Sequence, residues 1–390
     1  MNEWKTVKIG EICEQINGVS YKPADVYDSL TEKTTILLRA NNIFEDKLNY
    51  DELVFVDKKR ISENQYMKKG DILICASSGS KHLVGKAACL TEDKDLTFGA
   101  FCKVLRPKTV NSEYIKHYFF SPSYRTEISR LSEGANINNI KAADLDNLKI
   151  PLPSKSIQNK IAKQLDKCVK IINNQKKALE KYDTLIKSRF IEMFGDIRNQ
   201  EKYKGIPLSN LCKTMTGGTP PTSKPEYYEG TIPWITTVSL GPNHIDGKNA
   251  KGYITEEAIK NSATKLIPVG NILFGTRVGV GKSSINDVDI CTNQDIIALI
   301  GIDESRYSKL FIKHVLDQYQ PYFDSIKKGA TILGITTDDV KKSLIPDVSL
   351  SLQKEFETFV QQIDKSKFAV QKALEKAETL YKSLMQLYFA

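Results

Sequence analysis

The sequence has few of the features that mark membrane, secreted or metal-binding proteins. It contains no run of 18 apolar residues, so we expect no transmembrane helix. Its N-terminus lacks the charged-then-apolar pattern of a signal peptide. The seven cysteines are odd in number and scattered, and none forms a Cys-x-x-Cys pair. That favours reduced cytoplasmic thiols over disulfides or a structural zinc. The four histidines lack metal-ligand spacing, so we expect no metal site.

A catalytic constellation is also missing. Residues 275–283 resemble a phosphate-binding loop, but the position that needs glycine holds Thr276. Residues 219–222 (TPPT) resemble the Asp/Asn-Pro-Pro-aromatic motif of amino-methyltransferases, but they lack both the acidic or amide residue and the aromatic one. There is no carboxylate–lysine cluster typical of nucleases. We therefore predict a chain that is not an enzyme and binds no cofactor itself.

What the sequence does contain is an internal repeat. The run KALEK at Lys177–Lys181 returns at Lys372–Lys376, an offset of 195 residues in a chain of 390. Further identities follow at the same offset, ending with Phe194 against Phe389. A match of this length that divides the chain in half indicates a tandem duplication.

Each copy of this run lies in a long helical pattern. Apolar residues recur at steps of four and three over more than four heptads, which predicts two amphipathic helices, each about 40 residues and roughly 60 Å long. The two apolar stripes match in length, so we expect the helices to pair with each other, antiparallel. The predicted pairing residues are Ile161, Leu165, Ile172, Leu179, Ile186, Phe356, Val360, Ile363, Leu374 and Tyr381.

The regions before each helix are strand-rich, and they share short sequence motifs in the same order, which we call their common frame. In the first, short apolar runs predict strands at 36–38, 53–56, 72–75 and 97–105, and residues 114–131 predict a helix ended near Gly134. Gly70–Leu73 returns as Gly270–Leu273. The predicted fold is α+β, with two pseudo-symmetric globular domains separated by two long antiparallel coiled-coil helices. The predicted segments are domain 1 at 1–153, helix 1 at 154–195, a linker at 196–206, domain 2 at 207–348 and helix 2 at 349–390.

The net charge of the chain indicates which kind of partner it binds. The net charge is +9, and a basic protein favours a polyanion. A duplicated chain with pseudo-twofold symmetry also suits duplex DNA, which has local twofold axes of its own. Because the two domains diverge between their shared anchors, we expect them to read different half-sites.

These features together resemble the DNA-specificity subunits of type I restriction-modification systems of bacteria and archaea. The resemblance covers essentially the whole chain, and its most specific part is the alternation of a variable domain and a long helix. The segments that carry it are Ile150–Pro153 with Gln158–Ile161, Ile345–Pro346 with Leu352–Phe356, Ser188–Gly195, Gly70–Leu73, Gly85–Ala87, Phe98–Phe101 and Thr292–Ile296.

The resemblance implies a set of partners. It implies a non-catalytic subunit whose two target-recognition domains each read half of an asymmetric bipartite DNA site, while the paired helices set the spacer. It implies two methyltransferase (modification) subunits that dock on the helices and carry S-adenosylmethionine. It also implies restriction subunits that use ATP and magnesium. Two alternatives stay open, namely a stand-alone DNA-modifying enzyme and a coiled-coil scaffold that does not bind DNA.

Polar side chains that follow strands or lie in glycine-rich turns are the candidate DNA contacts, since such groups hydrogen-bond to base edges and phosphates. In the first domain these residues are Arg39, Asn41, Asn42, Ser78, Lys81 and His82. In the second they are Thr236, Thr237, Arg277, Lys282 and Asn293.

Overall fold

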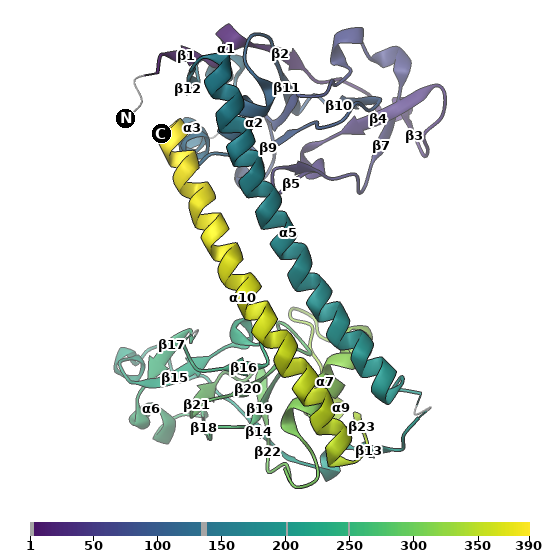
Figure 1. The fold of residues 1–390 in the computed structure, drawn as a ribbon, viewed down its shortest axis with the longest axis vertical. Helices are drawn as coiled ribbons and strands as arrows, with labels where there is room; N and C mark the ends of the chain where they lie inside the picture. Colours follow the sequence, from purple (N-terminus) through teal and green to yellow (C-terminus); the bar gives the residue numbers. More distant parts are fainter. Residues whose placement is uncertain (1–3, 134–138, 200–201, 249) are drawn as a thin grey trace. The chain divides into compact units, whose positions relative to one another are not determined.

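The computed structural model describes residues 4–133, 139–199, 202–248 and 250–390, and it is a mixture of helices and strands (Figure 1). Two helices of 40 residues dominate it, α5 at Lys155–Phe194 and α10 at Leu350–Phe389. The chain divides into two compact units, and the division falls within both long helices. Unit 1 comprises Met1–Lys177 with Gln371–Ala390, and unit 2 comprises Ala178–Val370.

The described part of unit 1 contains two four-stranded sheets, a short two-stranded sheet and a separate two-stranded hairpin. The first sheet is antiparallel, with the order β2 (Cys13–Asn17), β11 (Cys102–Pro107), β8 (Ile72–Cys75), β9 (Ala87–Cys89). The second has the order β10 (Leu96–Phe98), β4 (Thr34–Leu38), β7 (Val54–Asp57), β3 (Val26–Tyr27), and β10 runs parallel to β4. The small sheet pairs β1 (Thr6–Lys8) with β12 (Lys149–Pro151). The hairpin β5 (Ile43–Phe44) and β6 (Lys47–Leu48) and the helices α1 (Ile9–Ile12), α2 (Ser112–Phe119), α3 (Pro122–Glu133) and α4 (Ala142–Asp146) complete unit 1.

Two predicted elements of unit 1 are each broken in two. The predicted helix 114–131 is α2 followed by α3, because Pro122 has no N–H to continue the first helix and instead begins the second. The predicted end of this region near Gly134 lies outside the described residues. The predicted strand 97–105 is β10 and β11, separated by a turn at residues 99–101.

Unit 2 repeats this frame. Its main sheet has the order β14 (Lys213–Thr216), β22 (Ile296–Ile300), β19 (Ile272–Gly275), β20 (Ser283–Asn286), β16 (His244–Ile245). The second has the order β17 (Gly252–Ile254), β15 (Ile232–Ile235), β21 (Ile290–Thr292), β18 (Leu266–Ile267). The small sheet pairs β13 (Gly205–Pro207) with β23 (Leu344–Pro346). The helices are α6 (Glu256–Lys260), α7 (Lys309–Gln318), α8 (Gln320–Ile326) and α9 (Thr337–Lys341).

Strand registers show that the two frames correspond. In unit 1 β11 begins at Cys102, which pairs with Cys75, the last residue of β8. In unit 2 β22 begins at Ile296, which pairs with Gly275, the last residue of β19. The second sheet of each unit also contains a parallel pair, β10 with β4 in unit 1 and β21 with β15 in unit 2. The duplication indicated by the sequence is therefore also visible in the strand pairing.

Within each unit the two long helices run antiparallel. In unit 1 Tyr388 Oη donates to Gln164 Oε1 (2.9 Å), and Lys176 Nζ lies 3.5 Å from Glu378 Oε1. In unit 2 Lys367 Nζ lies 2.6 Å from Asp183 Oδ1, and Arg189 Nη2 lies 3.0 Å from Glu355 Oε1. Of the predicted pairing residues, the buried ones are Ile161, Leu165, Ile172, Ile186, Phe356, Val360 and Leu374, and the half-buried ones are Leu179, Ile363 and Tyr381.

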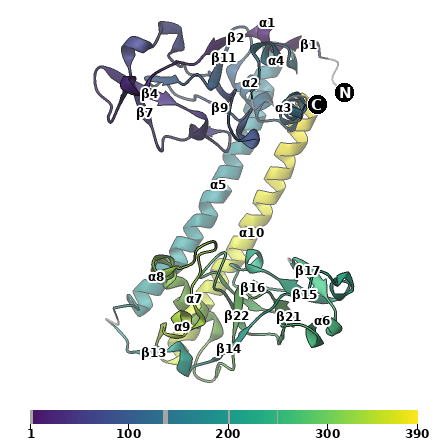
Figure 2. The same cartoon turned by 180° about the vertical axis from the view of Figure 1, so that it is seen from behind.

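Each unit consists of segments of α5 and α10 and a globular part, which we call its module. An aromatic core joins the helix segments to the module. In unit 1 Phe389 of α10 packs against Tyr114 and Tyr118 of α2, and both views show this end of α10 beside α3 (Figures 1 and 2). In unit 2 Phe356 of α10 lies edge-on to Phe190 of α5, with ring centroids 5.4 Å apart, and Phe190 also stacks on Phe311 of α7. The long helices are thus part of the module cores.

Candidate nucleic-acid interface

Three loops of unit 2 meet where strands of its two sheets end or begin. They are residues 236–240 after β15, 276–281 between β19 and β20, and 293–295 between β21 and β22, and we call them the apex loops of unit 2. Asn293 N donates to Ile235 O (3.1 Å), and Thr276 N donates to Asp295 O (2.8 Å). These bonds tie the three loops together, so the structure brings the predicted residues Thr236, Thr237, Arg277 and Asn293 into one region.

Arg277 is the candidate contact that this arrangement presents best. Its side chain is 57% exposed, and its Nη1 lies 3.9 Å from Asp295 Oδ1. The Asp295 carboxylate is itself held by Asn293, whose Nδ2 donates to Oδ2 (3.0 Å). A Cβ at Gly334 would lie 2.8 Å from Arg277 Cγ, so glycine there leaves room for the arginine stem. The stem is thus confined, while the guanidinium head is free to donate to a ligand.

Two neighbouring candidates are buried. Thr237 and Asn293 are only 3% and 8% exposed, so little of either side chain is accessible for the DNA contact that the sequence predicts. Asn293 instead positions Asp295, and its own Oδ1 is buried without a hydrogen-bond partner among the described residues. Thr236 is half-buried, and Lys282 is exposed at the end of its loop.

Unit 1 has corresponding loops. They are residues 39–42 after β4, including the 3-10 turn η2 (Ala40–Asn42), residues 76–85 between β8 and β9, and residues 99–101 between β10 and β11, and we call them the apex loops of unit 1. Gly99 N donates to Leu38 O (2.9 Å), and Ala76 N and Ser77 N both donate to Phe101 O (3.0 and 2.9 Å). The connections match those in unit 2.

The loop 39–42 of unit 1 combines exposed and buried polar groups. Arg39 is half-buried and donates to Glu52 O (3.0 Å), and the exposed Asn41 donates to Glu52 Oε2 (3.3 Å). Asn42 is fully buried, and its amide nitrogen donates to the carbonyls of Asn49 and Asp51. It therefore stabilises the loop, and its side chain is not accessible for the DNA contact that the sequence predicts.

The longer loop of unit 1 presents the remaining candidates. Ser78 is half-buried, and its hydroxyl accepts from Ser80 N (3.2 Å). His82 is exposed in the 3-10 turn η5 (Lys81–Leu83). The side chain of Lys81 lies outside the described residues. The hydroxyl and the imidazole offer mixed donor and acceptor groups, which suit base edges as well as phosphates.

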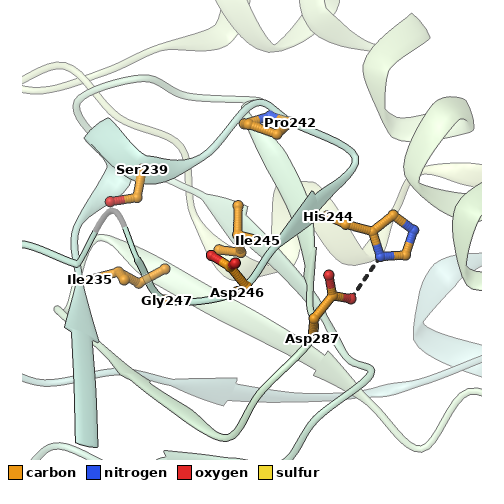
Figure 3. Close-up of a pocket in the computed structure, with 8 residues that line it drawn as sticks. All are labelled: Ile235, Ser239, Pro242, His244, Ile245, Asp246, Gly247 and Asp287. Carbon is orange, nitrogen blue, oxygen red and sulfur yellow. Dashed lines mark hydrogen bonds and ion pairs between the residues drawn. The ribbon is translucent and has the colours of Figure 1, made fainter. Parts of the chain in front are cut away.

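A polar pocket of about 230 Å³ adjoins the apex loops of unit 2, because Ser239 belongs to both (Figure 3). His244 Nδ1 lies 2.8 Å from Asp287 Oδ1, and both side chains are about half exposed. Asp246 faces the same space. Across the described ranges no group of three or more His, Cys, Asp or Glu residues could hold a metal ion. The pocket therefore offers hydrogen-bonding groups to a ligand but no metal centre.

The cysteine thiols are not set up as nucleophiles. Six of the seven are buried, and none is in a disulfide. Burial raises the pKa of Cys75 and Cys291 to about 11 and that of Cys13 and Cys102 to about 12. The thiolate is the reactive form, so these cysteines act as small apolar core residues.

A buried histidine joins three helices of unit 1. His117 of α2 lies with Nε2 3.1 Å from Asp166 Oδ1 of α5 and Nδ1 3.2 Å from Tyr381 Oη of α10. Lys116 Nζ approaches the same carboxylate (2.8 Å) and also pairs with Glu113. A neutral imidazole satisfies both contacts, because Nε2–H donates to Asp166 while Nδ1 accepts from Tyr381. The corresponding His314 of unit 2 is also buried, near Lys313 and Asp317 of α7.

These histidines make unfolding depend on pH. Burial lowers the pKa of both His117 and His314, so the folded chain holds them neutral while the unfolded chain titrates near 6.5. As pH falls through about 6.5 the unfolded state binds more protons, and each histidine costs up to about 1.4 kcal/mol of stability per pH unit. We expect the unfolding midpoint of unit 1, followed by Trp4 fluorescence in a Trp234→Phe background, to fall between pH 7.5 and pH 5.5.

The same measurement on two variants tests the cause. His117→Gln should lower the midpoint at pH 7.5 but reduce its further fall at pH 5.5. The matched control His82→Gln changes an exposed histidine of the same unit and should leave the pH dependence as in the parent chain. An equal fall in parent and His117→Gln would show that His117 does not contribute.

With the geometry described, comparison with known proteins gives the class. A model of the type I restriction modification DNA specificity domain matches residues 1–181 and again 200–378. The chain therefore belongs to this family of DNA specificity domains, and it carries the domain twice. Of the described helices, none is long and apolar enough to cross a membrane.

Particular relatives agree. The chain is 27% identical over 417 residues to the EcoKI specificity subunit of Escherichia coli K12, covering 99% of this chain and 88% of that protein. It is 40% identical over 185 residues to the StySPI specificity subunit of Salmonella potsdam, but this match spans only 47% of the chain and 40% of that relative. The crystal structure of a type I S subunit from M. genitalium has the same fold, with a TM-score of 0.57, 15% identity and coverage of 100% and 97%.

Proposed function

We propose that this chain is the non-catalytic DNA specificity subunit of a type I restriction-modification complex, and that each module reads one half of an asymmetric bipartite site. The observation that carries this proposal is the pairing of a shared frame with different apex loops in a chain that matches the specificity-domain model twice. Because the two modules share the same strand arrangement, they can dock on two half-sites of the DNA in the same way. Because their apex loops differ, they can contact different bases.

The proposed contact set follows from exposure. It keeps the candidates whose side chains are exposed or half-buried, retains Lys81 from the sequence prediction because its side chain lies outside the described residues, and treats Asn42, Thr237 and Asn293 as supporting residues. The proposed contacts are Arg39, Asn41, Ser78, Lys81, His82, Thr236, Arg277 and Lys282.

The proposed organisation assigns residues 1–153 and 207–348 to recognition, 154–195 and 349–390 to a paired spacer, and 196–206 to a linker. In this proposal the spacer also docks two methyltransferase subunits, which carry S-adenosylmethionine, and the complex works in the cytoplasm with restriction subunits that use ATP and magnesium. The antiparallel contacts of α5 and α10 within each unit support a coiled-coil pairing.

The experiment that tests the function is co-expression with the partner methyltransferase, followed by mapping of the methylated bases in host DNA. We expect two short, different sequences separated by a fixed spacer. A contiguous motif would contradict the two-module reading. Methyl transfer by the isolated chain would instead support a stand-alone enzyme. The absence of any salt-dependent DNA affinity would favour a scaffold, because phosphate contacts require such an affinity.

The spacer proposal predicts a change in the mapped motif when both helices are lengthened. Lys176 and Glu378 face each other, so one heptad inserted after Lys176 and one before Glu378 keep the apolar seams in register. Seven residues add about 10 Å of helix, and DNA rises about 3.4 Å per base pair, so the spacer should grow by about three base pairs.

The control for this prediction is the same heptad inserted after Arg198, in the segment between α5 and β13. That variant should keep the original spacer. If the doubly lengthened complex stays active and its spacer is unchanged, the helices do not set the spacing.

A further inference from the structure

The turn that breaks the predicted strand 97–105 presents an aromatic side chain to solvent. Phe101 is 71% exposed, although it stands between the buried strands β10 and β11. A continuous strand would have alternated its side chains between the two faces of a sheet. The turn instead carries Phe101 outward, among the apex loops of unit 1.

The backbone beneath Phe101 is firmly held. Its carbonyl accepts from both Ala76 N and Ser77 N, Cys102 N donates to Gly99 O (2.8 Å), and Ala100 N donates to Val19 O (3.0 Å). Gly18 packs so closely on this turn that a Cβ there would lie 2.1 Å from Gly99 O. The ring is therefore presented on a rigid support, so little backbone entropy is lost when it meets a ligand.

The corresponding position in unit 2 has different chemistry. Phe101 precedes the first residue of β11 and Asp295 precedes the first residue of β22, and the carbonyls of both accept from the loop that follows the central strand. In unit 2 this position is the carboxylate that approaches Arg277. One frame thus presents an apolar ring in one module and a carboxylate–guanidinium pair in the other.

We propose that Phe101 is a specificity-determining residue that makes apolar contact with the 5-methyl group of a thymine in the half-site read by unit 1. The inference rests on the proposed function, since it requires the apex loops to face the major groove. Thymine is the base that presents a methyl group there, and phenylalanine is one of the side chains that contacts it. The nearby hydroxyl of Ser78 and imidazole of His82 suit the polar edges of neighbouring bases.

The test uses the complex with its methyltransferase partner and DNA that carries the mapped site. Each thymine of the unit 1 half-site, on either strand, is replaced in turn by deoxyuridine, which lacks the methyl group. We expect one replacement to weaken binding about three- to tenfold, as the loss of one buried methyl group requires. Phe101→Ala should weaken binding of the thymine site at least as much and should no longer distinguish thymine from deoxyuridine at that position.

Controls separate this inference from the function on which it rests. Phe44→Ala removes another exposed phenylalanine of unit 1, in the β5–β6 hairpin, and should retain the discrimination. The effect of deoxyuridine replacements in the other half-site on binding should be the same in Phe101→Ala as in the parent chain. Site-specific binding in which no deoxyuridine effect depends on Phe101, or a unit 1 half-site without a thymine, overturns the inference alone. A complex without site-specific binding overturns the proposed function as well.

Discussion

Replacing Arg277 by alanine is expected to weaken binding of the specific DNA site by roughly 5- to 150-fold, because a bidentate arginine–guanine contact contributes about 1–3 kcal/mol of discrimination. The head of Arg277 is exposed and its carboxylate neighbour Asp295 lies beside one edge of the guanidinium. The measurement is fluorescence anisotropy at fixed salt with the mapped site and with each single base-pair change in the half-site read by unit 2.

Arg306 offers a matched control for this experiment. Its side chain is also 57% exposed and also approaches an aspartate, Asp347, but it lies beside α7, outside the apex loops. Arg306→Ala should therefore change specific and non-specific affinity little. If Arg277→Ala weakened all sequences equally, Arg277 would be a phosphate contact instead, and the assignment to a base would be wrong.

The second large effect is expected from Phe356→Ala, which should lower the free energy of unfolding of unit 2 by about 3–5 kcal/mol. Phe356 is fully buried and packs against Phe190, Phe194 and His314. Alanine would leave a cavity where α5, α7 and α10 meet. The two tryptophans separate the units, because Trp4 belongs to unit 1 and Trp234 to unit 2.

Urea unfolding of Phe356→Ala in a Trp4→Phe background reports on unit 2, and in a Trp234→Phe background it reports on unit 1. We expect a large shift of the first transition and a small one of the second. Phe356→Leu keeps most of the apolar volume and should cost much less. A shift of both transitions by the same amount would show that the units unfold together.

The long helices and the short buried strands could be predicted from the sequence because their signals are local. A heptad pattern over about 40 residues and runs such as Ile72–Cys75 need only neighbouring residues to be recognised. Pro122 is also a local signal, and it divides the predicted helix 114–131 into α2 and α3. A residue that precedes a proline disfavours the helical conformation, so this break is itself predictable from the sequence.

The apex loops could be predicted only in part. Arg277 and His82 follow the simple rule that polar residues in turns are exposed. Asn42 and Asn293 do not, because tertiary contacts decide whether an amide faces solvent or satisfies buried backbone and side-chain groups. Phe101, for which we propose a contact with thymine, is not among the predicted contacts, since an apolar residue in an apolar run indicates a strand core unless the break at residues 99–101 is known.

Unit 1 is built from two distant stretches of the chain, and this has a consequence for its synthesis on the ribosome. Its core contains Ile161 and Leu165 of α5 together with Leu384, Met385 and Phe389 of α10. Roughly 200 residues separate these two groups, so at about 5–20 residues per second the first group waits some 10–40 s for the second. Unit 2 is contiguous and can complete its core earlier. The nascent chain thus carries an unfinished apolar surface of unit 1 from the synthesis of α5 until that of the end of α10.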